Sequence, residues 1–200
     1  MALARFEHAA DVEVVHRSFQ LDERSPEGVT RTVTEMLRGK LGLSTAQIDG
    51  MTKRVEDLAR ADGLTPYIVR ENRVGNTSLA HELAAFAAEH GKAGEAWKHL
   101  YRAYFGEARS IFDIDSLAQI ASEIGLSADA ARQALISRRH AEQVAEDGRE
   151  ARALGSSGVP FFVIDRRYAV SGAQPPEALL QALASAWEDH ASGAPRPTAG

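Results

Sequence analysis

The sequence predicts an α/β protein in which a long helical stretch separates one early strand from a late hairpin and helix. Valines alternating with polar residues predict a strand over residues 11–21. Apolar residues then follow at helical spacing over residues 25–154. Two short apolar runs, residues 159–164 and 168–171, predict a hairpin, and a proline pair at 175 and 176 opens a last helix. This order fits one domain that carries an all-α insertion.

Helix boundaries within the long stretch are marked by capping residues. Ser44 and Gln47 have the spacing of a capping box, in which each residue satisfies an amide left free at a helix start. The helix that follows is expected to end at Gly63, and its apolar face comprises Ile48, Met51, Val55 and Leu58. Asn76 is expected to cap the next helix. Residues 1–10 are expected to be the remainder of a helix.

Composition excludes several classes of function. The chain has 200 residues, of which 44% are hydrophobic, so a core can form. The net charge of -5 and the absence of a basic cluster argue against nucleic acid as a partner. No apolar run approaches the length of a membrane span, and the first residues do not resemble a signal segment. We therefore expect a cytoplasmic protein without a membrane partner.

The sequence contains no cysteine. Disulfides, thiolate metal ligands and a cysteine nucleophile are therefore excluded within these residues. The seven histidines are scattered, and no two of them have the i, i+4 spacing that places two imidazoles on one helical face. We expect no metal site, and no residue is assigned a catalytic role.

Gly158-Val159-Pro160 is the most informative segment. Proline at the head of an apolar strand is unusual, because it cannot donate to the ladder. A cis Val159-Pro160 bond would turn the backbone N–H and C=O of Val159 outward, where they can pair with an extended ligand. From the residues alone, a trans proline that begins an edge strand is the simpler interpretation. Gly158 is expected to give the backbone room at this point.

The run from Gly158 to Val163, followed by residues 168–174, resembles the C-terminal signature of DsbA-family oxidoreductases of the FrnE type. Residues 11–22 resemble the second strand of that family, and residues 101–107 resemble a motif of its helical domain. Asn76-Thr77 with Ala80-His81 resembles a helix start that faces the active site. The similarity covers residues 5–188, and the resemblance implies a cis bond before Pro160. It also implies these substrate-binding residues: Gly158, Val159, Pro160, Asn76, Thr77 and His81.

This resemblance implies a thioredoxin-like fold with a large all-α insertion. Residues 1–24 would form the first thioredoxin-like part, residues 25–138 the helical insertion, and residues 139–190 the second thioredoxin-like part. Residues 191–200, rich in Pro, Gly, Ala and Ser, are expected to be disordered. For His81, a helix residue packed near the domain junction is the simpler interpretation than an acid–base group.

The sequence departs from the family at its start. The family has a first strand and then a Cys-x-x-Cys motif at a helix N-terminus, which lowers the thiol pKa. Neither feature is present, so the fold is expected to be N-terminally incomplete. Three explanations stay open: a start placed too far downstream, a relic that kept its binding surface, and a strand supplied by another chain. A homodimer is therefore left open.

Three functions fit these observations. The first is that of a thiol–disulfide oxidoreductase, acting on a thiol or disulfide protein or small molecule, with this chain itself inactive for lack of cysteine. The second is a glutathione-dependent isomerase or transferase related to the 2-hydroxychromene-2-carboxylate isomerases, in which Asn76, Thr77 and Val159 would line a groove for glutathione. The third is a non-catalytic module that binds a peptide or partner beside Pro160. No cofactor other than glutathione is expected.

Overall fold

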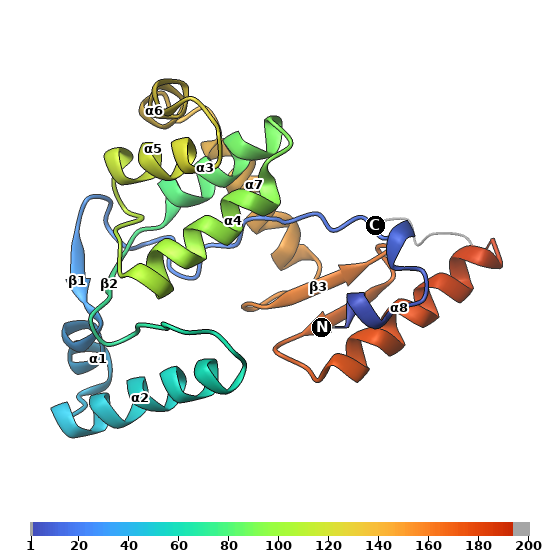
Figure 1. Cartoon of the computed structure of the whole chain (residues 1–200), viewed down its shortest axis with the longest axis horizontal. Helices are drawn as coiled ribbons and strands as arrows, with labels where there is room; N and C mark the ends of the chain where they lie inside the picture. Colours follow the sequence, from blue (N-terminus) through green and yellow to red (C-terminus); the bar gives the residue numbers. More distant parts are fainter. Residues whose placement is uncertain (1, 194–200) are drawn as a thin grey trace. The chain divides into compact units, whose positions relative to one another are not determined.

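The chain forms two compact units, and the computed structural model describes residues 2–193 of it (Figure 1). Of these residues, those up to Phe19 and those from Asp147 onward form the first unit. Gln20–Glu146 form the second unit, which is inserted in the chain between the two parts of the first. The division falls inside helix α7 (Ala141–Ala153).

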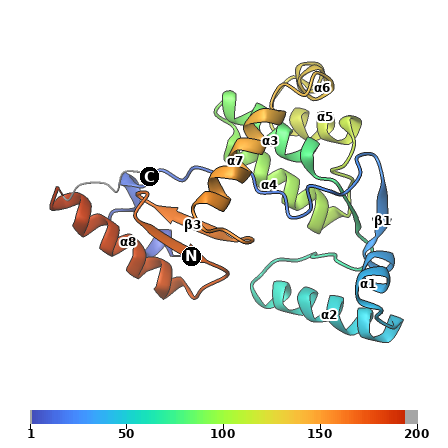
Figure 2. The ribbon, with the colours of Figure 1, turned by 180° about the vertical axis from the view of Figure 1, so that it is seen from behind.

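The first unit is built on the hairpin that the sequence predicted. Strand β3 (Phe161–Ile164) pairs antiparallel with strand β4 (Tyr168–Ser171), so that Phe161 lies opposite Ser171. Helix α8 (Pro176–Ala191) begins with proline at its first position and packs against both strands, as Figures 1 and 2 show from opposite sides. The predicted hairpin and the predicted last helix are therefore confirmed. The expected disorder of residues 191–200 lies, from residue 194 on, outside the described residues.

Two backbone conformations shape the hairpin turn. Asp165 and Arg166 both have positive φ, 49° and 57°, and the Arg167 amide donates to the Ile164 carbonyl at 3.0 Å. Two consecutive left-handed residues give a turn whose twist matches that of the flanking strands. The turn therefore joins β3 to β4 at close range although it contains no glycine.

Aromatic contacts attach the start of the chain to α8. The His8 ring stacks on the Trp187 ring at 3.9 Å, and the Phe6 ring meets the same indole edge-on at 6.4 Å. Arg5 Nη1 lies 2.9 Å from Glu177 Oε1. The expected helix over residues 1–10 is present only as two short 3-10 helices, η1 (Leu3–Arg5) and η2 (Ala9–Asp11).

The predicted strand over residues 11–21 is wrong. Val12 has an extended backbone, with φ of −101° and ψ of 117°, yet no residue of this segment beyond η2 belongs to a helix or a strand. A strand is completed only by hydrogen bonds to a neighbour, and within residues 2–193 no strand pairs with this segment. The segment is instead held by Ser18, whose buried amide donates to Asp147 Oδ2 at 2.9 Å.

The second unit is mainly helical but not entirely so. Strands β1 (Thr30–Thr32) and β2 (Arg73–Gly75) pair antiparallel within the stretch that was expected to be all-α. Three-residue strands are too short for alternation to show in the sequence. The helices are α1 (Val33–Leu41), α2 (Thr45–Ala61), α3 (Ser78–Glu89), α4 (Ala93–Tyr101), α5 (Ile114–Glu123) and α6 (Ala128–Ile136), and a π-helix, η3 (Arg102–Gly106), continues α4.

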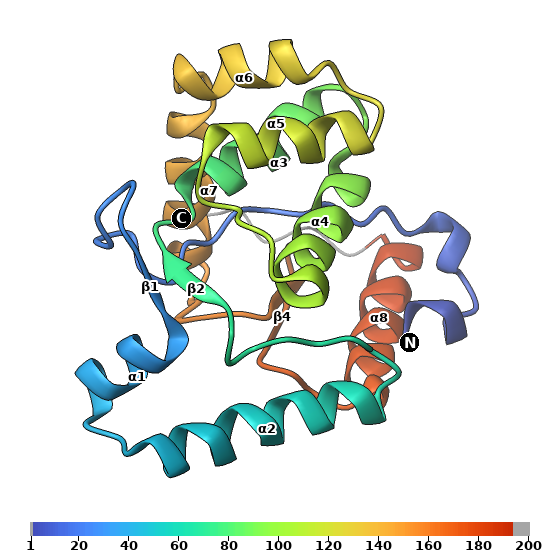
Figure 3. The same ribbon diagram turned by 60° about the vertical axis from the view of Figure 1, so that its left-hand side comes forward.

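Helices α3 to α6 enclose the main core of this unit (Figure 3). Leu83, Leu117, Ile120 and Leu135 are fully buried there. Burying a leucine or isoleucine side chain contributes about 1.5–3 kcal/mol relative to exposure, so these four side chains stabilise the helical packing substantially. None of the described helices has the length and apolarity needed to cross a membrane.

The predicted caps are confirmed. Ser44 and Gln47 form a capping box at the start of α2, and that helix ends at Ala61, two residues before Gly63. Asn76 Oδ1 accepts a hydrogen bond from the Ser78 amide at 2.8 Å at the start of α3. These side chains satisfy amides that a helix leaves free in its first turn.

Candidate substrate-binding site

The loop before β3 is held by hydrogen bonds as far as Gly158. After α7, the buried Ser156 donates from its amide to the Ala151 carbonyl at 2.9 Å. Its Oγ donates to the Gly158 carbonyl, also at 2.9 Å. A Cβ added at Gly158 would meet nothing within 4 Å, so the expectation that this glycine makes room for the backbone is wrong.

Val159 is exposed immediately before the strand. The residue is 53% exposed, and its peptide bond to Pro160 is cis, as the resemblance implied. Within the part of the chain that the structure describes, neither the N–H nor the C=O of Val159 forms a hydrogen bond. Val159 therefore presents both a donor and an acceptor that an extended ligand can use.

Strand β3 has one paired edge and one unpaired edge. The Pro160 carbonyl accepts a hydrogen bond from the Gly172 amide at 2.9 Å, so the backbone carbonyl of Pro160 points toward β4. Hydrogen-bonded and non-hydrogen-bonded pairs alternate along an antiparallel ladder. The backbone N–H and C=O groups of Phe162 and Ile164 therefore also point toward β4. Phe161 and Val163 therefore direct their N–H and C=O groups away from β4, and we call this pair the β3 edge. No described strand pairs with it.

Asn76 belongs to the second unit, and its amide is used within the fold. Besides capping α3 through Oδ1, it donates from Nδ2 to the Ser25 carbonyl at 2.7 Å. Thr77 contributes its carbonyl, which accepts from the His81 amide at 3.1 Å. These contacts hold the loop around residue 25 against the start of α3.

His81 lies one turn into α3 and is largely buried. Its ring meets the Trp97 ring edge-on at 5.4 Å, and its Nδ1 is buried without a hydrogen-bond partner. Burial lowers the pKa of His81 to about 4. The ring is therefore neutral at pH 7, which fits a packed helix residue better than an acid–base group.

A buried ion-pair network beside His81 was missed by the sequence analysis. Glu82 is 1% exposed, and its Oε1 accepts from Arg138 Nε at 2.8 Å. The other guanidinium nitrogens of Arg138 reach Glu27 Oε2 at 2.7 Å and Ser78 Oγ at 3.3 Å. Burial raises the pKa of Glu82 despite the charge of Arg138, whereas the hydrogen bond from Arg138 lowers the pKa of Glu27. A carboxylate among the apolar residues of an alanine-rich helix was the signal in the sequence that could have pointed to a buried, paired charge.

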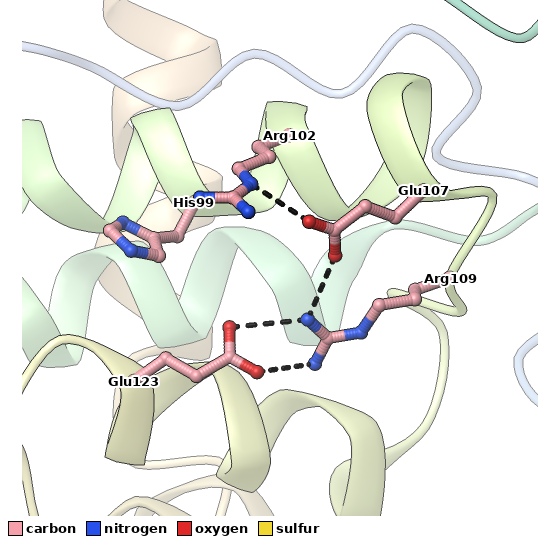
Figure 4. Close-up of a pocket in the computed structure, with 5 residues that line it drawn as sticks. All are labelled: His99, Arg102, Glu107, Arg109 and Glu123. Atoms are coloured by element: carbon pink, nitrogen blue, oxygen red, sulfur yellow. Dashed lines mark hydrogen bonds and ion pairs between the residues drawn. The ribbon is translucent and has the colours of Figure 1, made fainter. Parts of the chain in front are cut away.

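A shallow polar cavity of about 330 Å³ lies elsewhere in the second unit (Figure 4). The side chains that line it are His99, Arg102, Glu107, Arg109 and Glu123. Arg102 Nε lies 2.8 Å from Glu107 Oε1, and Arg109 Nη2 lies 2.8 Å from Glu123 Oε1. Because these charges already pair with one another, the cavity has no charge left over to attract a ligand. Among the described residues, no three His, Asp or Glu side chains form a group that could hold a metal.

The six expected site residues form two groups. Gly158, Val159 and Pro160 are consecutive in the first unit, and the other three lie at the start of α3 in the second unit. Each group is well defined within its own unit. In the first group Val159 offers an unpaired backbone N–H and C=O, whereas the residues at the start of α3 are used for packing and capping.

The first unit contains a hairpin that is entered through a cis proline and covered by a C-terminal helix, and a helical unit interrupts it in sequence. These features fit a thioredoxin-like α/β protein with a helical insertion. Comparison with known families agrees: the profile of the DSBA-like thioredoxin domain matches residues 1–184. The chain belongs to this family. It is mixed α/β, largely helical and contains few strands.

A solved structure supports the same assignment. The crystal structure of a probable DsbA oxidoreductase from Streptomyces coelicolor is 40% identical in sequence and superimposes with a TM-score of 0.87. The match covers 98% of this chain and 82% of the Streptomyces chain. A search of curated proteins found no significant match. Because the 200 residues include no cysteine, they supply no thiolate for the exchange reaction that the family name describes.

Proposed function

We propose that this chain binds extended polypeptide through the backbone of Val159, as the substrate-binding part of a DsbA-like oxidoreductase of the FrnE type. The observation that carries the proposal is the unpaired N–H and C=O of an exposed residue at the head of β3. An extended ligand gains affinity from main-chain hydrogen bonds and specificity from adjacent side chains. The substrates would be proteins or small molecules that carry a thiol or a disulfide.

Binding by this chain is reversible and non-covalent. Thiol–disulfide exchange requires a thiolate that attacks a disulfide sulfur. No residue in the sequence can provide one, so the chain is expected to leave insulin disulfides intact. Its contribution is recognition alone, and it takes place at the cytoplasmic location that we propose.

Amide hydrogen exchange measured by NMR tests this proposal. The probe is a short, Val- and Thr-rich peptide with one S-methylated cysteine, so that binding is measured without thiol chemistry. We expect the Val159 amide to exchange about tenfold more slowly when nine-tenths of the protein is bound, because only the unbound tenth exchanges. The Ala169 amide of β4 provides the internal control and should not change.

Two substitutions sharpen the test. Val159→Ala keeps the main chain and should still bind, whereas Val159→Pro removes the N–H donor and should abolish peptide binding. An unchanged exchange rate of the Val159 amide at millimolar peptide would contradict the proposal.

Calorimetric titration with glutathione tests the alternative function. Saturable heat would support a role as a glutathione-dependent isomerase. Asn76, which was expected to line the glutathione groove, already uses both its amide oxygen and its amide nitrogen within the fold.

A further inference from the structure

We propose that residues 20–28, which precede β1, form a strap that closes over the start of α3 and opens without unfolding of the second unit. All of these residues belong to the second unit, and none of them lies in a helix or a strand. An open strap uncovers hydrogen-bond donors that the closed strap occupies. The inference concerns the start of α3 alone, so it is independent of peptide binding at Val159.

The strap has no core contact that could hold it closed. None of its residues is buried, and its leucine, Leu21, is 74% exposed. The Ser25 amide donates to the Asp22 carbonyl at 3.3 Å, which is a contact within the strap itself. Segments with few buried apolar contacts open at a much smaller cost in free energy than the whole domain unfolds. Side-chain hydrogen bonds to the rest of the unit therefore decide whether the strap is closed.

The first latch is Arg138, which joins the strap to the buried part of the unit. Its Nη1 lies 2.8 Å and 2.7 Å from the two carboxylate oxygens of Glu27, while its Nε donates to the buried Glu82 at 2.8 Å. The hydroxyl of Ser78 donates to the same Glu27 carboxylate at 3.2 Å. Because the bond to Glu82 fixes the guanidinium, release of Glu27 leaves Arg138 in place.

The backbone of Arg138 is also fixed. Its φ is 53°, in the left-handed region that glycine usually occupies after a helix. The Arg139 amide donates to the Ala134 carbonyl at 3.1 Å, which closes the end of α6. A residue other than glycine keeps such a conformation only where its surroundings determine it. The latch therefore has a fixed side, Arg138 with α6, and a movable side, the strap.

The second latch is Asn76, which caps α3. Its Nδ2 donates to the Ser25 carbonyl of the strap at 2.7 Å. Its Oδ1 accepts from the Ser78 amide at 2.8 Å, a contact that does not involve the strap, so α3 keeps its cap when the strap opens. An open strap therefore frees three donors at the start of α3, namely Asn76 Nδ2, Ser78 Oγ and Arg138 Nη1.

Limited trypsin proteolysis under native conditions tests the inference, because Arg24 is exposed within the strap. A protease must draw several residues into its active site, so cleavage after Arg24 reports how often the strap is open. Glu27→Gln removes the charge that pairs with Arg138, and we expect cleavage about three- to fivefold faster than in the wild type. Asn76→Asp keeps a capping oxygen but loses the donor to Ser25, and it should speed cleavage by a similar factor.

Glu89→Gln is the matched control. Glu89 is the last residue of α3, and its carboxylate, 39% exposed, pairs with Arg139 at 3.0 Å. This variant should be cut after Arg24 at the rate of the wild type. The inference is overturned if Glu27→Gln is cut no faster than Glu89→Gln. It is also overturned if cleavage after Arg132 in α6 accelerates equally, because that pattern indicates unfolding of the whole unit.

Thiol labelling gives a second measurement, which does not depend on protease access. Ser78 is 8% exposed and the sequence has no cysteine, so Ser78→Cys places a single buried thiol next to Glu27. In this background Glu27→Gln should speed labelling by about the factor by which it speeds cleavage, and Glu89→Gln should leave the labelling rate unchanged. Labelling that is insensitive to Glu27→Gln would overturn the inference, because the start of α3 would then stay covered.

Discussion

The neutral state of His81 follows from its position rather than from a charged partner. Its pKa falls from 6.5 to about 4 because the ring is buried against Trp97. In the unfolded chain the imidazole takes up a proton below pH 6.5, whereas in the folded chain it stays neutral until about pH 4. Acid therefore stabilises the unfolded state relative to the folded state across this interval.

We predict that His81 makes the wild type lose stability on acidification. Its contribution should lower the free energy of unfolding by up to about 3 kcal/mol between pH 6.5 and pH 4, with no further loss below that range. Urea unfolding of wild type, His81→Phe and His81→Gln at several pH values checks this. In both variants the free energy of unfolding should depend less on pH. Phe and Gln differ in shape and polarity but neither takes up a proton, so a change common to both reports the charge of His81 and not its packing. Equal pH dependence in all three would contradict the assignment.

Glu82 and Arg138 form the second residue-level feature with a measurable consequence. The carboxylate is buried, and the arginine that pairs with it also reaches the half-exposed Glu27. Removing one partner of a buried pair leaves an uncompensated charge, which costs far more than loss of an exposed pair. The two acidic partners of Arg138 should therefore differ sharply in their contribution to stability.

We predict that Arg138→Met lowers the free energy of unfolding by about 3–5 kcal/mol. Glu27→Gln, which removes only the exposed partner, should cost less than about 1 kcal/mol. Adding Glu82→Gln to Arg138→Met should recover part of the loss, because the stranded charge disappears. Urea unfolding at pH 7 measures all three, and absence of any recovery would show that packing, not charge, causes the loss.

At the scale of elements, the two aspartates at the start of α5 have different roles. Asp113 Oδ1 accepts from the Ser116 amide at 2.8 Å, which caps the helix. Asp115 is 83% exposed and pairs with Arg132 on the surface. Both residues lie near the positive end of the helix, where a negative charge is favourable. Only the structure separates the cap from the surface ion pair.

We predict that Asp113→Ala lowers the free energy of unfolding by about 1–2 kcal/mol, the usual cost of losing a helix cap. Asp115→Ala, two residues along the same helix, should cost about 0.5 kcal/mol or less. Thermal and urea unfolding of the two variants provide the comparison. Similar losses in both would mean that helix charge, rather than the hydrogen bond to Ser116, accounts for the effect.

Local signals in the sequence predicted the elements that depend on local physics. The apolar runs around β3 and β4, the prolines at α8 and the cap at Asn76 all act within a few residues. The strand over residues 11–21 failed because alternation shows which residues suit a strand but not whether a neighbouring strand exists. The β1–β2 pair failed for the opposite reason, since its two strands are too short to show a period.

At the scale of the whole molecule, the family could be predicted from motifs spread along the chain, and the long-range contacts could not. Arg138 and Glu82 are 56 residues apart, and Asn76 and Ser25 are 51 residues apart. Nothing in either local pattern specifies the partner. For the candidate site, the sequence singled out Val159 and Pro160 correctly as an unusual backbone, but the expectation for Asn76 missed that its amide is consumed by the fold.

The division of the first unit between the two ends of the chain affects the order in which the protein can fold during synthesis. The residues up to Phe19 leave the ribosome before the rest of their unit, because the α7 and α8 residues that contact them come after the whole of Gln20–Glu146. Chains grow at about 5–20 residues per second, so the second unit has several seconds in which to fold by itself. Throughout that interval His8 lacks the Trp187 ring on which it stacks in the folded unit. The segment up to Phe19 is therefore open to a ribosome-associated chaperone while its own unit is still incomplete.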